Sequence, residues 1–185
     1  MPRYIAFLRG VNVGGNNKVS MAALKALMEG HGYGRVVTYI NSGNILFSSD
    51  GTDTHTLQLQ LEALIQARFS LKIPVTVVPG EALLEAMAHA PAWWNADKDS
   101  KHNAIFVIPP TAVETVFETV GPAKPEYEQV AAYDRVIFWS APVATFSRTR
   151  WLGIVGSRVY DSVTIRNANT VTRLAQLLRA EGTLA

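Results

Sequence analysis

The sequence predicts an α+β protein built from two βαββαβ subdomains packed together, with one further helix at the C-terminus. Three observations predict this fold class: the order of apolar segments in the first half, a similar order in the second half, and the turn residues between the segments. Hydrophobic residues make up 48% of the 185 residues and charged residues 17%, which is enough apolar surface for a packed interior. We expect an N-terminal subdomain over residues 1–79 and a C-terminal subdomain, with linking and terminal helices, over residues 80–185.

The first half begins with an apolar run, Arg3–Leu8, which is typical of a buried strand. Ser20 then has the hydroxyl that an N-cap needs to accept a hydrogen bond from the first turn of a helix. The elements that follow are a helix with Met21, Leu24, Leu27 and Met28 on one face, a strand over Arg35–Ile40, a turn at 41–43, a strand over Ile45–Phe47, a helix carrying Leu57, Leu61, Leu64 and Ile65, and a strand over Val75–Val78. This order is the ferredoxin-like arrangement, in which a right-handed crossover makes the first two strands parallel and the third antiparallel to both.

The second half shows a similar order of elements. These are a linking helix over Glu81–Met87, a strand over Ala104–Ile108, a helix carrying Val113, Val116, Phe117 and Val120, a hairpin of Glu128–Ala132 and Val136–Trp139, a short helix over Arg150–Val155, a strand over Val159–Ile165, and a helix carrying Val171, Leu174, Leu177 and Leu178. This order predicts a second ferredoxin-like unit followed by one helix. Because the two halves share no visible sequence identity, an internal duplication is a structural hypothesis.

Several kinds of site are excluded by composition and motif. The absence of cysteine excludes disulfides, thiolate metal sites and cysteine nucleophiles. The N-terminal apolar run is interrupted by Arg9 and is too short for a signal peptide or a membrane span, so we expect a cytoplasmic protein without membrane association. The histidines, His31, His55, His89 and His102, lack metal-ligand spacing, and there is no G-x-S-x-G motif. We therefore expect no metal and no cofactor, name no catalytic residue, and leave open whether the protein is an enzyme.

Basic residues are unevenly distributed along the chain, although the formal net charge is only +2. Between residues 145 and 173 the only acidic residue is Asp161, whereas five arginines occur there: Arg148, Arg150, Arg158, Arg166 and Arg173. Such asymmetry is typical of proteins that bind an anionic ligand or a nucleic acid. The other interpretation, solvated surface charge, stays open.

Two polar loops of the first half are candidates for a binding site. The loop over residues 9–18 joins a strand to a helix, where free backbone N–H groups favour anions, but it matches neither a P-loop nor G-x-G-x-x-G. The predicted topology places the turn over residues 41–44 at the same edge of the sheet. The candidate ligand-binding residues in these loops are Arg9, Asn12, Lys18, Asn41, Ser42 and Asn44. The same residues would also suit two loops that only hydrogen-bond to each other.

A third candidate region combines residues 147–150 with residues 164–170. Arginine presents a planar set of donors that suits phosphate or carboxylate, so several arginines at one end of the second sheet would form an anion clamp. The candidate ligand-binding residues here are Arg148, Arg166, Asn167 and Asn169. In the alternative interpretation, Asn169 or Thr170 caps the last helix and Arg166 pairs with an acidic side chain.

Three segments together resemble a known family. They are YIAFLRGVNVGGNNK at residues 4–18, YINSGN at 39–44 and TIRNANTV at 164–171, and they resemble the signatures of the bacterial "domain of unknown function 1697" (DUF1697) family. The resemblance implies an α+β fold with two subdomains and no established activity, cofactor or partner. In the last segment, members of the family usually have a sequence similar to Arg-Asn-Trp-Asn-Thr, whereas this chain has Ala168 at the position of the Trp. The absence of the indole ring removes a packing or stacking surface.

The function that these features favour is binding of a phosphorylated or nucleotide-like anionic small molecule, with or without a reaction on it. One alternative is nucleic-acid binding, since the element order matches RNA-recognition modules. Those modules stack bases on aromatic side chains of their central strands, where this chain offers Tyr4, Phe7 and Phe47. The other alternative is a non-catalytic protein-interaction domain.

Overall fold

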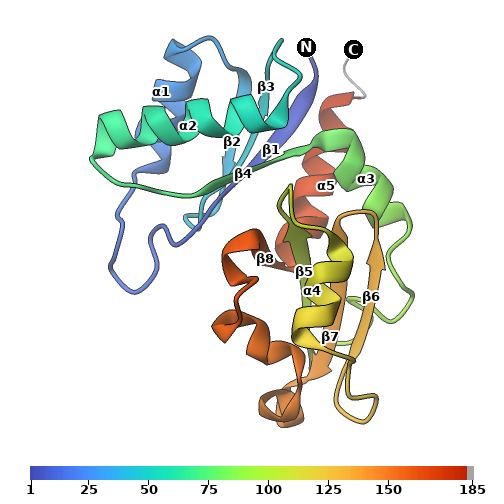
Figure 1. The fold of residues 1–185 in the computed structure, drawn as a ribbon. Helices are drawn as coiled ribbons and strands as arrows, with labels where there is room; N and C mark the ends of the chain where they lie inside the picture. The colour runs from blue at the N-terminus through green and yellow to red at the C-terminus, as the bar shows by residue number, and fades with distance from the viewer. Residues whose placement is uncertain (183–185) are drawn as a thin grey trace. The chain divides into compact units, whose positions relative to one another are not determined.

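The computed structural model describes residues 1–182 and contains two four-stranded antiparallel sheets over that range (Figure 1). The first sheet has the strand order β2-β3-β1-β4, and β3 is antiparallel to both β1 and β2, as predicted. The elements of this half are β1 (Arg3–Leu8), α1 (Met21–Gly30), β2 (Gly34–Tyr39), β3 (Asn44–Ser48), α2 (Thr54–Phe69) and β4 (Val75–Pro79).

The second sheet has the order β6-β7-β5-β8, which repeats the order of the first sheet with β5 to β8 in place of β1 to β4. The elements of this half are α3 (Gly80–Ala88), β5 (Ser100–Val107), α4 (Val113–Val120), β6 (Gln129–Tyr133), β7 (Val136–Pro142), the 3-10 helices η1 (Val143–Arg148), η2 (Trp151–Gly156) and η3 (Tyr160–Ser162), β8 (Val163–Asn167) and α5 (Ala168–Gly182). The three 3-10 helices occupy the place in the chain that α2 has in the first half. The protein is therefore a mixed α/β protein with a C-terminal helix.

The chain forms two compact units whose boundaries fall inside helices. The first unit contains residues 1–84 together with the part of α5 that begins at Leu174. The second unit is Glu85–Arg173. Both α3 and α5 therefore pass from one unit to the other. Among residues 1–182, every helix is too short or too polar to cross a membrane.

The first unit is held together by α1 and α2 packing on one face of its sheet (Figure 1). Ser20 is the N-cap of α1, and its hydroxyl accepts a hydrogen bond from the Ala23 N–H at 3.2 Å, as the sequence predicts. Behind the helices, the rings of Tyr4 and Phe47 stack with centroids 5.6 Å apart. The buried helix residues that pack on this face are Leu24, Met28, Leu57, Leu61 and Ile65.

In the second unit, α4 and η2 cover one face of the sheet. Trp151 of η2 is fully buried, and its ring meets Phe117 edge-on at 4.9 Å. The short helix expected over Arg150–Val155 is this 3-10 segment. The strand expected over Val159–Ile165 begins only at Val163, because the preceding residues form η3 and pairing with β5 starts at Val163.

The N-cap of α2 leads to a pH-dependent prediction. The Asp53 carboxylate accepts hydrogen bonds from the hydroxyl of Thr56 and, at 2.8 Å, from the Thr56 N–H. Both bonds lower the pKa of Asp53 below its ordinary value of 3.8, and the bond from the Thr56 hydroxyl has the larger effect. A lowered pKa means that the group stabilises the folded state fully above the unfolded-state pKa and loses that effect as the pH falls through the folded-state pKa.

We therefore expect Asp53→Asn to be less stable than the wild type near neutral pH, and the difference to narrow as the pH falls below about 3.8. Urea unfolding at several pH values measures it, with the exposed Asp50→Asn as the control for loss of one carboxylate. A difference that stays constant down to about pH 2 would contradict the assignment.

Candidate functional site

The two polar loops of the first unit meet through the side chain of Asn12. Its Nδ2 donates to the carbonyl of Asn41 at 2.7 Å and to that of Val19 at 2.9 Å. Its Oδ1 accepts from the Val19 N–H at 2.9 Å. Asn12 has a φ of 54°, in the left-handed region that asparagine tolerates better than most residues. The structure thus brings the two loops together, and the Asn12 amide group is used in the hydrogen bonds that hold them.

Ser42 and Asn44 also hold this turn in place. Asn44 is fully buried, and its Nδ2 donates to the Tyr39 carbonyl at 3.2 Å and to the Ser42 hydroxyl at 3.1 Å. Gly43 lies against the end of β1, where its carbonyl accepts from the Leu8 N–H at 2.8 Å. Two of the six candidates in these loops, Ser42 and Asn44, are thus bonded to each other within the turn.

An open groove of about 870 Å³ lies beside the joined loops. Two exposed cations, Lys18 and Arg68, line it together with the first turn of α1. The first turn of α1 contains no acidic residue, so its positive end is not neutralised there. The residues that line the groove are Asn12, Gly15, Lys18, Val19, Ser20, Met21, Ala22, Ala23, Asn41, Arg68 and Phe69.

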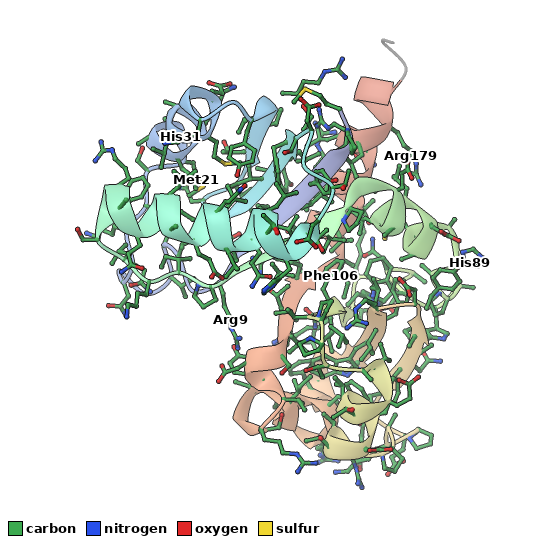
Figure 2. All side chains as sticks on the ribbon, turned by 45° about the horizontal axis from the view of Figure 1, so that its top comes forward. Arg9, Met21, His31, His89, Phe106 and Arg179 are labelled. Atoms are coloured by element: carbon green, nitrogen blue, oxygen red, sulfur yellow. The ribbon has the colours of Figure 1, made fainter. Side chains whose placement is uncertain are left out.

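Arg9 and Met21 are both labelled in the first unit in Figure 2. Met21 begins α1 and lines the groove, whereas Arg9 is half-buried and is not one of the lining residues. The backbone N–H of Arg9 donates to the Pro74 carbonyl at 3.0 Å. Of the six candidates in the first unit, the groove therefore contains Asn12, Lys18 and Asn41.

Arg68 was not among the predicted residues, although the topology contains a signal for it. β4 is antiparallel to β1, and Val75 at its start pairs with Leu8 at the end of β1. The end of α2, which leads into β4, must therefore return to the edge of the sheet where the first loop begins. That argument places Arg68, in the last turn of α2, near the candidate loops.

The second unit has a cavity of about 760 Å³ at one edge of its sheet. It is lined by residues 95–98 and 100–103, and by Asn167, Ala168 and Asn169. Asn167 is the cap of α5, since its Oδ1 accepts from the Thr170 N–H at 2.8 Å. The capping role considered for Asn169 or Thr170 thus belongs to Asn167. Asn169 is exposed in the first turn and faces the cavity, and the small Ala168 leaves room beside it.

The two candidate arginines make contacts elsewhere in the second unit. Arg166 donates from Nη1 to the Thr164 hydroxyl at 3.1 Å and to the Ile165 carbonyl at 2.9 Å, both on its own strand. The guanidinium of Arg148 lies 5.7 Å from the centre of the Tyr127 ring. Neither arginine is a lining residue of the cavity. The structure therefore does not bring them together with Asn167 and Asn169 as an anion clamp.

A buried histidine at the wall of this cavity was missed by sequence reasoning. His102 on β5 is 8% exposed, and its Nδ1 lies 2.6 Å from the hydroxyl of Ser140 on β7. Its Nε2 lies 2.9 Å from the backbone carbonyl of Asp97 and 3.7 Å from the Asp97 carboxylate. Neither His102 nor Ser140 lies in a recognised motif, and the two come together only through the pairing of β5 with β7.

A buried carboxylate stabilises the same unit. Glu128 is 3% exposed and accepts four N–H hydrogen bonds. The donors are the backbone N–H groups of Lys124, Arg150 and Trp151 and the indole of Trp139, at distances of 2.8 to 3.2 Å. With all its acceptor positions used, Glu128 ties the start of β6 to η2 and leaves no free oxygen for a ligand.

Within residues 1–182, no cluster of three His, Cys, Asp or Glu side chains could hold a metal ion. The fold and the two candidate sites define a mixed α/β protein of two units. The first unit has the groove beside its joined loops, and the second unit has the cavity beside Asn167 and Asn169. The chain belongs to the DUF1697 family, because the family model described as "Protein of unknown function (DUF1697)" matches residues 1–138.

A solved structure is also similar to this chain over almost its whole length. It is that of the conserved bacterial protein SP0830 from Streptococcus pneumoniae, with 30% sequence identity and a TM-score of 0.83. The match covers 96% of this chain and 98% of that one. No curated protein matches the chain.

Proposed function

We propose that this protein binds a phosphorylated or nucleotide-like small molecule in the groove of the first unit. The observation that carries the proposal is that Lys18, Arg68 and the N-terminal turn of α1 line one groove. These groups come from two separate parts of the chain, residues 18–23 and the last turn of α2, which the fold brings to one place. Lys18 and Arg68 attract anions by their positive charge. The first turn of α1 attracts them because the first N–H groups of a helix have no backbone acceptor within the helix.

The balance of charge in the groove also supports an anionic ligand. Its lining residues include two cations and no carboxylate. Arg68 can form two parallel hydrogen bonds to phosphate oxygens, whereas Lys18 acts as a mobile point charge. At about 870 Å³ the groove is in the range of small-molecule sites. The hydrogen bonds of Asn12 to both loops would keep the groove in shape without ligand.

Nucleic-acid binding through the sheet face is less well supported. That mode needs aromatic side chains exposed on the central strands. Tyr4 and Phe47 pack beneath the helices, and Phe7 on the opposite face is fully buried. The first sheet therefore lacks the stacking surface that the element order suggested. We further infer that both units are ferredoxin-like, since each sheet has the strand order that this arrangement requires.

A thermal-shift screen with inorganic phosphate, sugar phosphates and nucleotides tests the proposal. A ligand present at 100 times its Kd stabilises the folded state by about 2.7 kcal/mol. For a chain of this size, that corresponds to a rise in Tm of roughly 5–10 °C. We expect Lys18→Ala and Arg68→Ala each to weaken binding of the selected ligand about tenfold.

Lys72→Ala is the matched control, because it removes the same charge from an exposed position of the same unit outside the groove. Binding by this variant should equal that of the wild type. The proposal fails if none of these compounds raises the Tm, or if all three variants bind as tightly as the wild type.

A further inference from the structure

The start of β5 is covered by a neighbouring strand on one side only. On one side, β7 pairs with β5 from Ser100 to Phe106. On the other side, β8 pairs with β5 only from Asn103 onward, because the chain begins helix α5 at Ala168, directly after β8. In the described part of the chain, residues 100–102 therefore form an open strand edge on the side of β8.

The register of the sheet shows which backbone groups face this open edge. In an antiparallel ladder, alternate residues direct both their N–H and their C=O group to the same neighbouring strand. The Val107 N–H donates at 2.9 Å to the carbonyl of the residue before β7, and the Ile108 N–H donates at 2.8 Å to that of the residue before β8. Even-numbered residues of β5 thus face β8. The N–H and C=O groups of Ser100 and His102 therefore point to the edge that β8 leaves open.

The open edge lies in the wall of the cavity of about 760 Å³. Ser100 and His102 both line this cavity, and its other walls are the loop over residues 95–98 and the start of α5. The wall thus presents N–H donors and C=O acceptors in the alternating order of an unpaired strand. An extended peptide backbone has the complementary groups at the same spacing, which is how peptides add a strand to an exposed sheet edge.

One end of the open edge favours a negative charge. The first turn of α5 contains no acidic residue, and the N–H groups of Ala168 and Asn169 have no backbone acceptor within the helix. The residues that line the cavity include two lysines, Lys98 and Lys101, and a single carboxylate, Asp97. Because α5 starts where β8 stops, a peptide that runs parallel to β5 would bring its C-terminal carboxylate to this turn.

We propose that this cavity binds the C-terminal end of an extended peptide from a partner protein. The peptide lies parallel to β5, so that one of its residues donates to the Ser100 carbonyl and accepts from the His102 N–H. Its terminal carboxylate accepts hydrogen bonds from the first turn of α5. Asn95 and Asn103 line the space that its side chains occupy. Pairing with the backbone gives affinity that does not depend on the peptide's sequence, and these side chains add selectivity.

A library of N-acetylated pentapeptides of mixed sequence with free C-termini tests the proposal, and the same library with amidated C-termini is the comparison. Amide hydrogen exchange of the whole chain, followed by NMR, shows where peptides bind. We expect the N–H groups of Ser100 and His102 to exchange at least about tenfold more slowly with the free-acid library than without it. The amidated library should leave their exchange unchanged, because a neutral end gains little from the positive end of α5.

A substitution at Asn169, which is exposed in the first turn of α5, separates binding from stability. Asn169→Glu should keep or raise the Tm, because a carboxylate there complements the helix dipole. The same carboxylate should weaken binding of the free-acid peptides at least about tenfold, because it repels their terminal carboxylate. Asn169→Gln is the matched uncharged control and should bind like the wild type.

Three results would each overturn the proposal. The first is exchange at Ser100 and His102 that the free-acid library does not slow. The second is equal protection by the free-acid and amidated libraries, and the third is equal binding by Asn169→Glu and Asn169→Gln. Phosphate binding in the groove of the first unit is measured separately, so either proposal can fail alone.

Discussion

Replacing Glu128 with glutamine is expected to lower the free energy of unfolding by about 3 kcal/mol, or roughly 6–12 °C in Tm. Glutamine has nearly the same shape, but one carboxylate oxygen becomes an NH2 group. That group would face two N–H donors: those of Lys124 and Arg150, or those of Trp139 and Trp151. Two hydrogen bonds to a charged acceptor are lost, and buried donors are left without partners.

The control is Glu126→Gln, two residues away and exposed. It makes the same chemical change at the surface, where substitutions usually alter stability by less than about 0.5 kcal/mol. Urea unfolding of the three proteins measures the difference. If Glu128→Gln and Glu126→Gln unfold at the same urea concentration, Glu128 does not tie η2 to the sheet.

Replacing Gly43 with alanine is expected to lower the free energy of unfolding by about 3 kcal/mol. Gly43 has a φ of +82°, and a Cβ there would lie 2.6 Å from Leu8 Cβ and 2.7 Å from Val11 Cγ2. Backbone strain accounts for about 1 kcal/mol of the effect and overpacking against β1 for the rest. Because this turn also carries Asn41, the substitution should weaken phosphate binding in the neighbouring groove.

Gly32→Ala separates the two causes, because Gly32 has a φ of +86° but no heavy atom within 4 Å of the added Cβ. Backbone strain alone should lower its stability by about 1 kcal/mol. Equal losses for the two variants would mean that the close approach to Leu8 and Val11 is relieved by a small shift. Thermal unfolding followed by circular dichroism is sufficient for this comparison.

Much of the fold follows from local pattern. The apolar run Arg3–Leu8 and the stripe that begins at Val113 predict the bounds of β1 and α4 closely, because each segment buries one continuous apolar surface. The connection from β7 to β8 was not predictable in the same way. Its buried hydrophobic residues Trp151 and Ile154 lie in one 3-10 helix of six residues, so the sequence predicts a short helix over Arg150–Val155 but neither η1 nor η3.

The candidate sites also contain one part that the sequence predicts and one part that it does not. Convergence of the first two loops follows from strand order, and the structure brings Asn12 and Asn41 into contact. The His102–Ser140 pair could not be predicted, because the apolar pattern ends at Ala104 on one strand and at Trp139 on the other. The strands continue past these points through backbone pairing with each other. Register between such polar ends depends on the rest of the sheet, so single-sequence patterns do not determine it.

The passage of α3 and α5 between the units affects the order in which the protein is made. All of the second unit, Glu85–Arg173, leaves the ribosome before the last segment of the first unit, which starts at Leu174. The central part of the chain is therefore synthesised in full before the helix that closes the first unit. In the first unit, an added Cβ at Gly80 would lie 3.1 Å from Leu178, so synthesis of the closing helix completes a tightly packed contact around Gly80.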